Sequence, residues 1–450
     1  MTQICQTPQR RLLNQEPTAR SILEEDLPVG RTEIELSAPP ARLQLAEPST
    51  GTQKILALVR LHTHPLGIVV LDGRADRRWE THAATVWSAM RVAVNEHLLA
   101  DEMAPVNDTG SLGRVRGPVH RCLQRRAAVL ADPPHITVVV ATRERPESLR
   151  DCLYALLDLE YPRFDVVVVD NDPVTSSTAE VLTHFPQRVR YVREDRRGLA
   201  SAHNRGLAEV RGQITAFVDD DVIVDRHWLT AIAEGFAAAP DVGCVTGLIL
   251  PAQLDTPAQL LLERHGGFDK GFALKVFGGT DHRSDDPLFP FTAGRLGSGA
   301  NMAFDTSVLR ELGGFDPAIG VGTFARGGDD LAAFFRVVLR HQVVYQPDAI
   351  VWHKHHREMA ALRNQAFGYG VGLGAFLTSV MVQEPTMWPH LLRRLPAGVG
   401  YAFKASSARN QGRYVGWPSE LARLEKRGLA YGPVAYAVSR WRTHRSAAHQ

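Results

Sequence analysis

Cysteine is scarce in this 450-residue sequence, and the positions of the few cysteines argue against two kinds of site. The four cysteines, Cys5, Cys122, Cys152 and Cys244, lie far apart and show none of the paired spacings of zinc-binding motifs. The same scatter argues against a disulfide framework and favours a reducing compartment such as the cytoplasm. We therefore predict neither a zinc site nor disulfide bonds.

Long apolar runs are also missing. Residues 1–10 lack the apolar core of a signal peptide, and no run of about 18 apolar residues occurs, so no membrane-spanning helix is predicted. The formal net charge of +2 gives no reason to expect nucleic acid as a partner. A hydrophobic content of 44% and a charged content of 22% are typical of a soluble globular protein, and the length suffices for two or three domains.

Two catalytic motifs are absent as well. The sequence contains no Gly-x-Ser-x-Gly nucleophile elbow and no P-loop lysine. The loop at 141–146, which follows the first strand of the predicted main domain, has no glycine. A sugar nucleotidyltransferase needs a glycine-rich basic loop at that point, so this activity is disfavoured.

The chain divides into five segments by composition and periodicity. Residues 1–50 are rich in Pro, Gln, Glu, Arg and Thr, and predict a mobile arm with at most a short strand at Glu33–Leu36. Residues 51–105 predict a small α+β unit, 106–132 a linker, 133–356 the main α/β domain, and 357–450 a mostly helical region. This last region is basic, with 13 Lys and Arg against 4 Glu and no Asp, a balance of +9.

The small unit carries one feature of chemical interest. Strands predicted at 54–61 and 67–71 flank a loop that contains His62 and His64, and an amphipathic helix is predicted over 81–99. The two histidines could bind a metal, but we interpret them as turn residues.

The main domain alternates strands with helices. Near-continuous apolar strands are predicted at 136–141, 164–169, 189–192 and 214–218, with helices between them. This pattern predicts a parallel, doubly wound, Rossmann-like sheet that is covered on both faces. Ligands bind such sheets beyond the carboxyl ends of their strands.

Acidic side chains gather at those predicted ends. Asp219, Asp220 and Asp221 follow the strand at 214–218. Three adjacent negative charges repel one another, and a divalent cation removes that cost. Oxygen ligands suit Mg²⁺ or Mn²⁺, which leave coordination positions for substrate phosphates. A solvated acidic turn that caps the next helix is the alternative interpretation.

Five motifs in order resemble family 2 glycosyltransferases, which have the GT-A fold and invert the anomeric centre. They are VVVATRERP (138–146), VVVVDND (166–172), GLASAHNRG (198–206), FVDDD (217–221) and GGDD (327–330). The resemblance covers 133–356, and it implies a role for each matching position. It implies nucleotide contacts for Thr142, Arg143, Glu144, Asp170 and Asn204, donor contacts for Asp219 and Asp220, metal binding by Asp221 with Asp219 and His353, and a catalytic base at Asp330 beside Asp329.

The resemblance implies a Mn²⁺- or Mg²⁺-dependent inverting glycosyltransferase. Its donor would be a nucleotide-diphosphate sugar, UDP-sugar by default, and its acceptor a hydroxyl of a glycan, a lipid-linked molecule or a small molecule in cell-envelope, polysaccharide or glycoconjugate synthesis. A non-catalytic nucleotide-sugar-binding module is the alternative. The basic C-terminal region predicts either a helical cap on the main domain or a surface that meets anionic membrane. We expect a cytoplasmic protein, in the second case peripheral at the inner face of the membrane.

Overall fold

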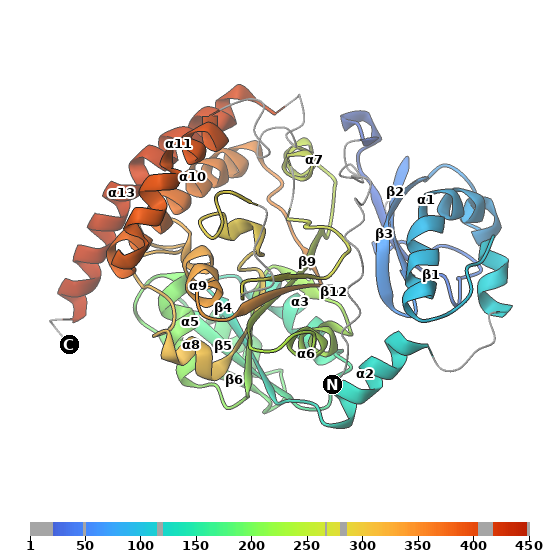
Figure 1. The fold of residues 1–450 in the computed structure, drawn as a ribbon, viewed down its shortest axis with the longest axis horizontal. Coiled ribbons are helices and arrows are strands. Elements are labelled where there is room, and N and C mark those ends of the chain that lie inside the picture. The colour runs from blue at the N-terminus through green and yellow to red at the C-terminus, as the bar shows by residue number, and fades with distance from the viewer. Residues whose placement is uncertain are drawn as a thin grey trace.

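The computed structural model describes residues 21–47, 51–114, 120–265, 268–279, 286–403 and 417–447. Figure 1 shows a central α/β body with a small sheet-and-helix unit on one side and long C-terminal helices on the other. The predicted α/β class, with a small N-terminal unit and a helical C-terminal region, is confirmed.

The small unit is a three-stranded sheet covered by one helix. Its elements are β1 (Gly30–Glu35), β2 (Lys54–Leu61), β3 (His64–Asp72) and α1 (Trp79–Ala100). Strand β2 pairs with β1 in parallel and with β3 in antiparallel. Leu36 and Leu43 are buried in the same core as Val86 and Val94 of α1. Part of the expected N-terminal arm therefore belongs to this unit, while residues 1–20 and 48–50 lie outside the described residues.

The main sheet has nine strands in the described part of the chain. They are β4 (Ile136–Thr142), β5 (Phe164–Asn171), β6 (Val189–Glu194), β7 (Ile214–Asp219), β8 (Val222–Val224), β9 (Val242–Pro251), β10 (Lys275–Phe277), β11 (Asn301–Asp305) and β12 (Gln342–His353). The order is β10-β12-β9-β11-β7-β4-β5-β6, and β8 also pairs with β12.

The four strands predicted to be parallel, β4, β5, β6 and β7, are parallel. Strand β11 runs antiparallel to both β7 and β9. It is buried on both faces like its parallel neighbours, so its apolar pattern does not reveal its direction. Strand β12 is long and has an irregular register with β9 near Gln346.

Helices cover both faces of the main sheet. They are α3 (Pro146–Leu157), α4 (Ser177–Leu182), α5 (Leu199–Ala208), α6 (Trp228–Ala237), α7 (Pro257–Arg264), α8 (Thr306–Glu311) and α9 (Asp329–Val338). Val138 and Val140 of β4 pack in a core with α3 and α6, whereas Val139 packs in the opposite core with α5, α8 and α9. Because both faces are buried, the strands are continuously apolar.

The predicted linker contains a helix that docks on the main domain. Helix α2 (Arg121–Ala131) packs beside α6, and the Arg126 guanidinium lies 3.1 Å from Glu234 of α6 and 3.5 Å from Asp348 of β12. Arg60 of β2 also forms a buried ion pair with Asp225 of the main domain. The Arg60 contact attaches the small unit directly to the main domain, and the Arg126 contacts attach α2 to it.

The described part of the C-terminal region contains three long helices, α10 (Met359–Gln383), α11 (Trp388–Phe403) and α13 (Ser419–Ala447). Among the described residues α10 is one helix long and apolar enough to cross a membrane, although the sequence analysis predicted none. Half of that apolar window is buried in the structure, chiefly against α13 and α9. A helix in the core of a globular protein can have the same apolar composition and be buried in this way.

Glycines bring α10 and α13 into backbone contact. A Cβ on Gly370 would lie 2.0 Å from the carbonyl oxygen of Glu425, and a Cβ on Gly432 would lie 2.5 Å from Gly374 Cα. Side chains larger than hydrogen do not fit at these positions. The helix pair therefore depends on glycine for its close approach.

We predict that Gly370→Ala destabilises the protein by about 1–3 kcal/mol, because the new methyl group must displace α13. Gly368→Ala in the same helix is the matched control. Its Cβ would meet nothing closer than Arg326 Cβ at 3.9 Å, so alanine should be neutral or stabilising by up to about 1 kcal/mol. Denaturant unfolding of both variants measures the difference, and equal stabilities would contradict the packing described here.

Candidate active site

Two strands bring the acidic cluster and a histidine together. Strand β7 ends at Asp219, and the chain then turns into β8, which pairs antiparallel with β12 so that Val222 lies opposite His353. This register places His353 Nε2 3.3 Å from Asp221 Oδ1. Ligand atoms of Asp219, Asp221 and His353 all lie within 4.8 Å of one another. The structure thus brings together the three predicted metal ligands.

The electrostatics of this triad favour a cation. Burial and the charge of Asp221 raise the pKa of Asp219 to about 7. Burial alone would raise the pKa of Asp221 as well, but the hydrogen bond and charge of His353 lower it. Asp221 Oδ1 accepts no well-aligned hydrogen bond among the described residues. Two carboxylates and one imidazole around an unsatisfied oxygen fit a divalent cation such as Mn²⁺ or Mg²⁺.

Asp220 points to different partners from its two neighbours. Its carboxylate accepts hydrogen bonds from the Thr142 hydroxyl at 2.6 Å and from Arg145 Nη1 at 3.1 Å. The same Arg145 nitrogen lies 3.1 Å from Asp221 Oδ2. Burial raises the pKa of Asp220, and Arg145 and Thr142 partly offset this rise. Asp220 therefore ties the ends of β4 and β7 together and holds Arg145 over the cluster.

The other residues predicted to contact the nucleotide base lie at the ends of β4 and β5. Asp170 is buried and accepts a hydrogen bond from the Tyr191 hydroxyl at 3.0 Å, while its Oδ1 has no partner among the described residues. Arg143 pairs with Asp172 at 3.1 Å, and Glu144 accepts hydrogen bonds from the Val174 and Thr175 amides. Because β5 pairs with β4 and β4 with β7, these residues lie at the same edge of the sheet as the acidic cluster.

Asn204 is the predicted donor-binding residue that does not join this group. Its side chain accepts a hydrogen bond from the Phe315 amide at 2.7 Å and donates one to the Phe315 carbonyl at 2.8 Å. Both ends of the amide are thus engaged with one backbone unit. In the structure Asn204 fixes the segment after α8, and its contact with a nucleotide stays a prediction.

Asp329 and Asp330 begin α9 behind Gly328, whose φ of +90° is a left-handed conformation suited to glycine. Asp329 is 4% exposed and lies 3.7 Å from His203 Nδ1. Asp330 is less buried and accepts hydrogen bonds from the Gly299 and Leu331 amides at 2.9 and 2.8 Å. Of the two carboxylates, Asp330 is the one that a substrate can reach more easily.

The two acidic groups share one electrostatic environment. Burial and the charge of Asp330 raise the pKa of Asp329 to about 7, and the charge of Asp219 adds to this rise. Burial also raises the pKa of Asp330, which the amide hydrogen bonds partly offset. The Gly299 amide that bonds Asp330 lies two residues before Asn301, and Asn301 pairs with Val218 of β7, so the start of α9 lies close to the end of β7.

Sequence reasoning missed three side chains here. Arg145 stands two positions after the predicted Arg143, His203 lies beside Asp329, and Lys270 is close enough to Asp330 for its pKa to respond to that charge. Each had a signal in the sequence, since Arg145 and His203 lie inside the motifs at 138–146 and 198–206, and Lys270 lies in 251–297, which has the irregular composition of an active-site loop. The α10 helix also contributes, because Gly372 packs against Gly327 and Gly328.

Comparison with known proteins agrees with this geometry. The model of the family described as glycosyl transferase family 2 matches residues 137–308, which span β4 to α8 and include Thr142, Asp170 and Asp219. Residues 137–308 are therefore a domain similar to family 2 glycosyltransferases. The acidic cluster at the end of β7 lies inside this domain, whereas Asp329, Asp330 and His353 follow the matched residues.

Curated relatives resemble the family 2 domain over part of their length. An uncharacterized protein of Sinorhizobium fredii is 32% identical over 35% of this chain and 17% of its own. The pre-mycofactocin glycosyltransferase of Mycobacterium tuberculosis is 27% identical over 50% of this chain and 44% of its own. The poly-beta-1,6-N-acetyl-D-glucosamine synthase of Staphylococcus epidermidis is 29% identical over 25% of this chain and 28% of its own. The chain thus spans less than half the length of these relatives.

Among solved structures, a mannosyltransferase from Pyrobaculum calidifontis in complex with GDP-Man and Mn²⁺ is similar to this chain. The identity is 20%, the TM-score is 0.42, and the alignment covers 73% of this chain and 88% of the other.

We predict that Asp221→Ala weakens Mn²⁺ binding more than tenfold, because it removes one of the three side chains whose ligand atoms lie within 4.8 Å of one another. Asp220→Asn is the matched control, since its side chain bonds Thr142 and Arg145 rather than joining the triad, and it should retain most of the affinity. Calorimetric titration of both variants makes the measurement. Equal Mn²⁺ affinity in wild type and Asp221→Ala would remove the metal role from this aspartate.

Proposed function

We propose that this chain transfers a sugar from a nucleotide-diphosphate sugar to an acceptor hydroxyl, in a metal-dependent single displacement that inverts the anomeric centre. One observation carries the proposal. The Asp219, Asp221 and His353 triad lies at the carboxyl end of β7, and Asp330 is bonded to the Gly299 amide just before β11, the strand that pairs with β7. A metal-binding group and a general base in one site are what this reaction needs.

Departure of the nucleoside diphosphate leaves negative charge at the triad. A bound Mn²⁺ or Mg²⁺ would supply Lewis-acid stabilisation of that charge. Asp219, Asp221 and His353 would hold the ion, and Arg145 adds a positive charge 3.1 Å from Asp221. Charge stabilisation by groups already in position lowers the barrier without reorganisation during the reaction.

Asp330 is the proposed general base. An acceptor hydroxyl is too weak an acid to attack freely at neutral pH, so a carboxylate within hydrogen-bond reach takes its proton. Asp330 is held by two backbone amides at the start of α9, where the helix dipole favours its ionised form. The oxygen then attacks the anomeric carbon as the bond to phosphate breaks on the opposite face, which inverts the centre.

Asp170 suggests which bases the donor carries. Its Oδ1 accepts no hydrogen bond among the described residues, and it lies at the end of β5 where the base is expected. A free acceptor oxygen suits a base edge that presents an N–H group, as uracil, thymine and guanine do. We propose a UDP-sugar as the donor, with dTDP- and GDP-sugars next.

We predict that Asp330→Asn lowers kcat about 10²-fold or more with intact donor binding, because asparagine keeps the size of the side chain and one of the two backbone hydrogen bonds but cannot take a proton. Asp329→Asn is the matched control, since Asp329 is buried and should affect stability more than turnover. Steady-state kinetics and donor titrations separate the two effects. An inactive Asp329→Asn beside an active Asp330→Asn would move the base by one residue.

A panel of nucleotide sugars with Mn²⁺ or Mg²⁺ tests the donor and the alternative of a non-catalytic binding module. Ligands that bind only the folded chain raise its melting temperature by mass action. We expect the largest rise with a UDP-sugar and metal together, followed by slow hydrolysis of that donor without acceptor. A donor that stabilises the chain but is never hydrolysed or transferred would favour the binding module.

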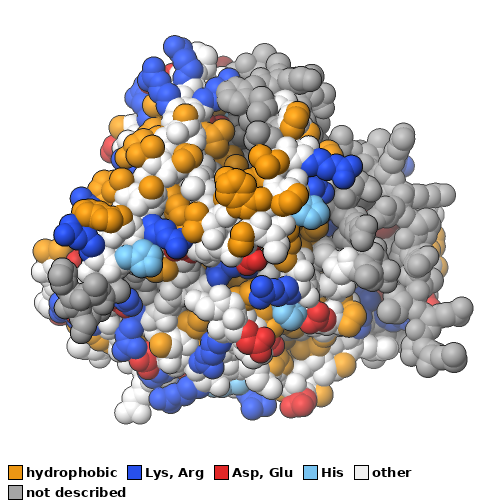
Figure 2. Space-filling model, turned by 60° about the vertical axis from the view of Figure 1, so that its left-hand side comes forward, with side chains coloured by type: hydrophobic (Ala, Val, Ile, Leu, Met, Phe, Trp, Pro, Cys, Tyr) orange, Lys and Arg blue, Asp and Glu red, His pale blue; other side chains and the backbone are white. Residues whose placement is uncertain are grey.

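A membrane-facing role for the C-terminal helices has separate support. Exposed apolar side chains lie on α11 and α13, among them Leu392, Val434 and Trp441 at 56–58% exposure. Figure 2 shows hydrophobic side chains interspersed with Lys and Arg on the face that carries these helices. Residues 357–450 have a charge balance of +9. We propose that this face contacts anionic lipid, and that each basic residue near the membrane surface contributes about 1 kcal/mol to the binding free energy.

Co-sedimentation with anionic liposomes tests this contact. Trp441→Ser with Leu392→Ser should reduce binding, and salt should weaken the binding of wild type. Val92→Ser on α1, also 59% exposed, is the control in the small unit and should bind as wild type does. Removal of the whole region is not a clean test, because α10 is packed against the Gly327–Gly328 loop. Equal binding of wild type, the Trp441→Ser and Leu392→Ser double variant, and Val92→Ser would reject the membrane contact.

A further inference from the structure

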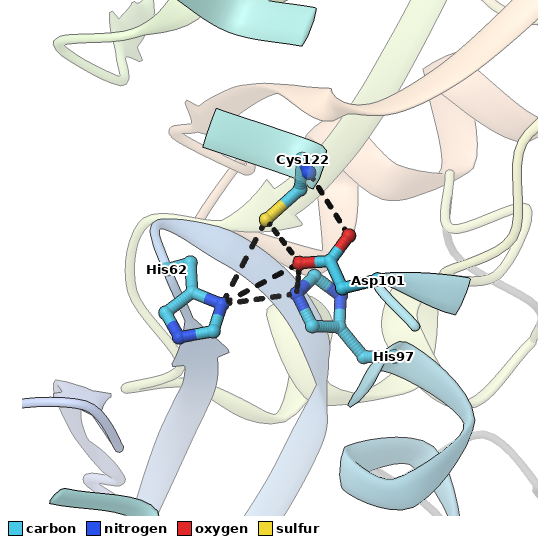
Figure 3. A group of neighbouring side chains, drawn as sticks. All are labelled: His62, His97, Asp101 and Cys122. Atoms are coloured by element: carbon cyan, nitrogen blue, oxygen red, sulfur yellow. Dashed lines mark hydrogen bonds and ion pairs between the residues drawn. The ribbon is translucent and has the colours of Figure 1, made fainter. Parts of the chain in front are cut away.

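Four potential metal ligands converge at the junction between the small unit and α2. They are His62 in the turn between β2 and β3, His97 near the end of α1, Asp101 directly after α1, and Cys122 at the start of α2. Figure 3 shows their side chains pointing toward one another from three different segments of the chain. None of these residues takes part in the proposed glycosyl transfer.

The distances between their ligand atoms are close to the edges of a tetrahedron. His62 Nδ1 lies 3.3 Å from His97 Nε2, 3.7 Å from Cys122 Sγ and 4.0 Å from Asp101 Oδ2. His97 Nε2 lies 3.8 Å from the same oxygen, and Cys122 Sγ lies 2.8 Å from it. Zinc bond lengths of about 2.0–2.3 Å give tetrahedral edges of about 3.3–3.8 Å. Of these five distances, only the one between thiol and carboxylate must lengthen, by less than about 1 Å, to admit an ion.

The charges around Asp101 leave room for a cation. The Asp101 side chain is 1% exposed, and the nearest basic groups are histidines at 3.7–4.0 Å and the exposed Arg125 at 3.9 Å. A buried carboxylate whose nearest arginine among the described residues is 3.9 Å away and exposed is only partly compensated.

The turn that presents His62 is held in a conformation that its residues rarely adopt. His62 and Thr63 have φ values of +53° and +71°, as in a type I′ hairpin turn, where Asn and Gly are usual. Their amides donate to the Glu35 carboxylate at 3.0 and 2.8 Å, which fixes the turn. Strained backbone of this kind concentrates at ligand sites, and here it aims His62 Nδ1 at the other three ligands.

We infer that His62, His97, Asp101 and Cys122 bind a structural Zn²⁺ ion that fastens α2 to the small unit. Two neutral imidazoles, one carboxylate and one thiolate would balance the charge of the ion, and the thiol proton would leave to solvent. The Cys122 amide already donates to Asp101 Oδ1 at 2.9 Å and orients the carboxylate. His120 stands beside the site, with its Nδ1 3.7 Å from Asp101 Oδ2.

The donor set distinguishes this ion from the one proposed for catalysis. A thiolate with imidazoles selects Zn²⁺, whereas carboxylate-rich sites suit Mg²⁺ and Mn²⁺. Four protein ligands close the coordination sphere, as in structural zinc sites. Because α2 also carries Arg126, which pairs with Glu234 and Asp348, the ion would lie where the small unit is joined to the main domain.

Cobalt substitution in the full chain tests the inference directly. Chelator-treated wild type titrated with Co²⁺ should develop a thiolate-to-cobalt charge-transfer band that saturates at one ion per chain and disappears when Zn²⁺ is added. Cys122→Ser should lose the band, and His97→Gln should weaken Co²⁺ binding by more than about tenfold. Asp221→Ala should keep the band in full, because its site contains no sulfur.

Stability provides a second measurement. Zn²⁺ should raise the melting temperature of chelator-treated wild type and of Asp221→Ala, but not that of His97→Gln. If the ligand variants fail to fold, the wild-type titration alone decides. A folded wild type without the charge-transfer band would overturn the inference and leave the cluster as a hydrogen-bonded network. A band that persists in Cys122→Ser would overturn it by assigning the thiolate to another cysteine.

Discussion

The repulsion between buried carboxylates is the interaction on which the active site depends. Asp219 and Asp221 at the end of β7, and Asp329 and Asp330 at the start of α9, are crowded into one poorly solvated region. Such a concentration of negative charge is tolerated only with compensating groups. His353, Arg145 and backbone amides compensate part of this negative charge. The compensation is incomplete, because the pKa of Asp219 and that of Asp329 still rise to about 7. A cation and a substrate bound at the site would complete it.

The surrounding architecture keeps those carboxylates in place. The β8–β12 pairing fixes His353 beside Asp221, and the Thr142–Asp220–Arg145 contacts join β4, β7 and the start of α3. Asn204 holds the segment that leads toward α9 from the other side. The C-terminal helices take part as well, since α10 packs on the loop that precedes Asp329. The site is therefore supported by segments far outside the matched family domain.

Much of this arrangement could be predicted from sequence, because the signals are local. Continuous apolar runs located β4, β5 and β7, and the residues after each run lie at the carboxyl edge of the sheet whatever the rest of the fold does. The direction of β11 was not predictable, since side-chain pattern does not depend on it. Arg145 was missed because its role depends on how the start of α3 meets the end of β7, which no spacing along the chain encodes.

The cluster around Cys122 shows the same limit more sharply. Motif reasoning about zinc relies on ligands close together in sequence, and it led to the prediction of no zinc site. Here 60 residues separate His62 from Cys122, and a hairpin turn and two helices bring them together. Only His97 and Asp101 have a local signal, being one helical turn apart.

The contact between Gly372 and the Gly327–Gly328 loop has a mechanical consequence. A Cβ on Gly328 would lie 2.5 Å from the Gly372 carbonyl oxygen, so backbone meets backbone with no side chain between them. Side chains can change rotamer and absorb small displacements, but two backbones in contact cannot. A shift of α10 by an ångström is therefore passed on to the first turn of α9 almost undiminished. The position of α10 and that of the proposed catalytic carboxylates are in this sense mechanically coupled.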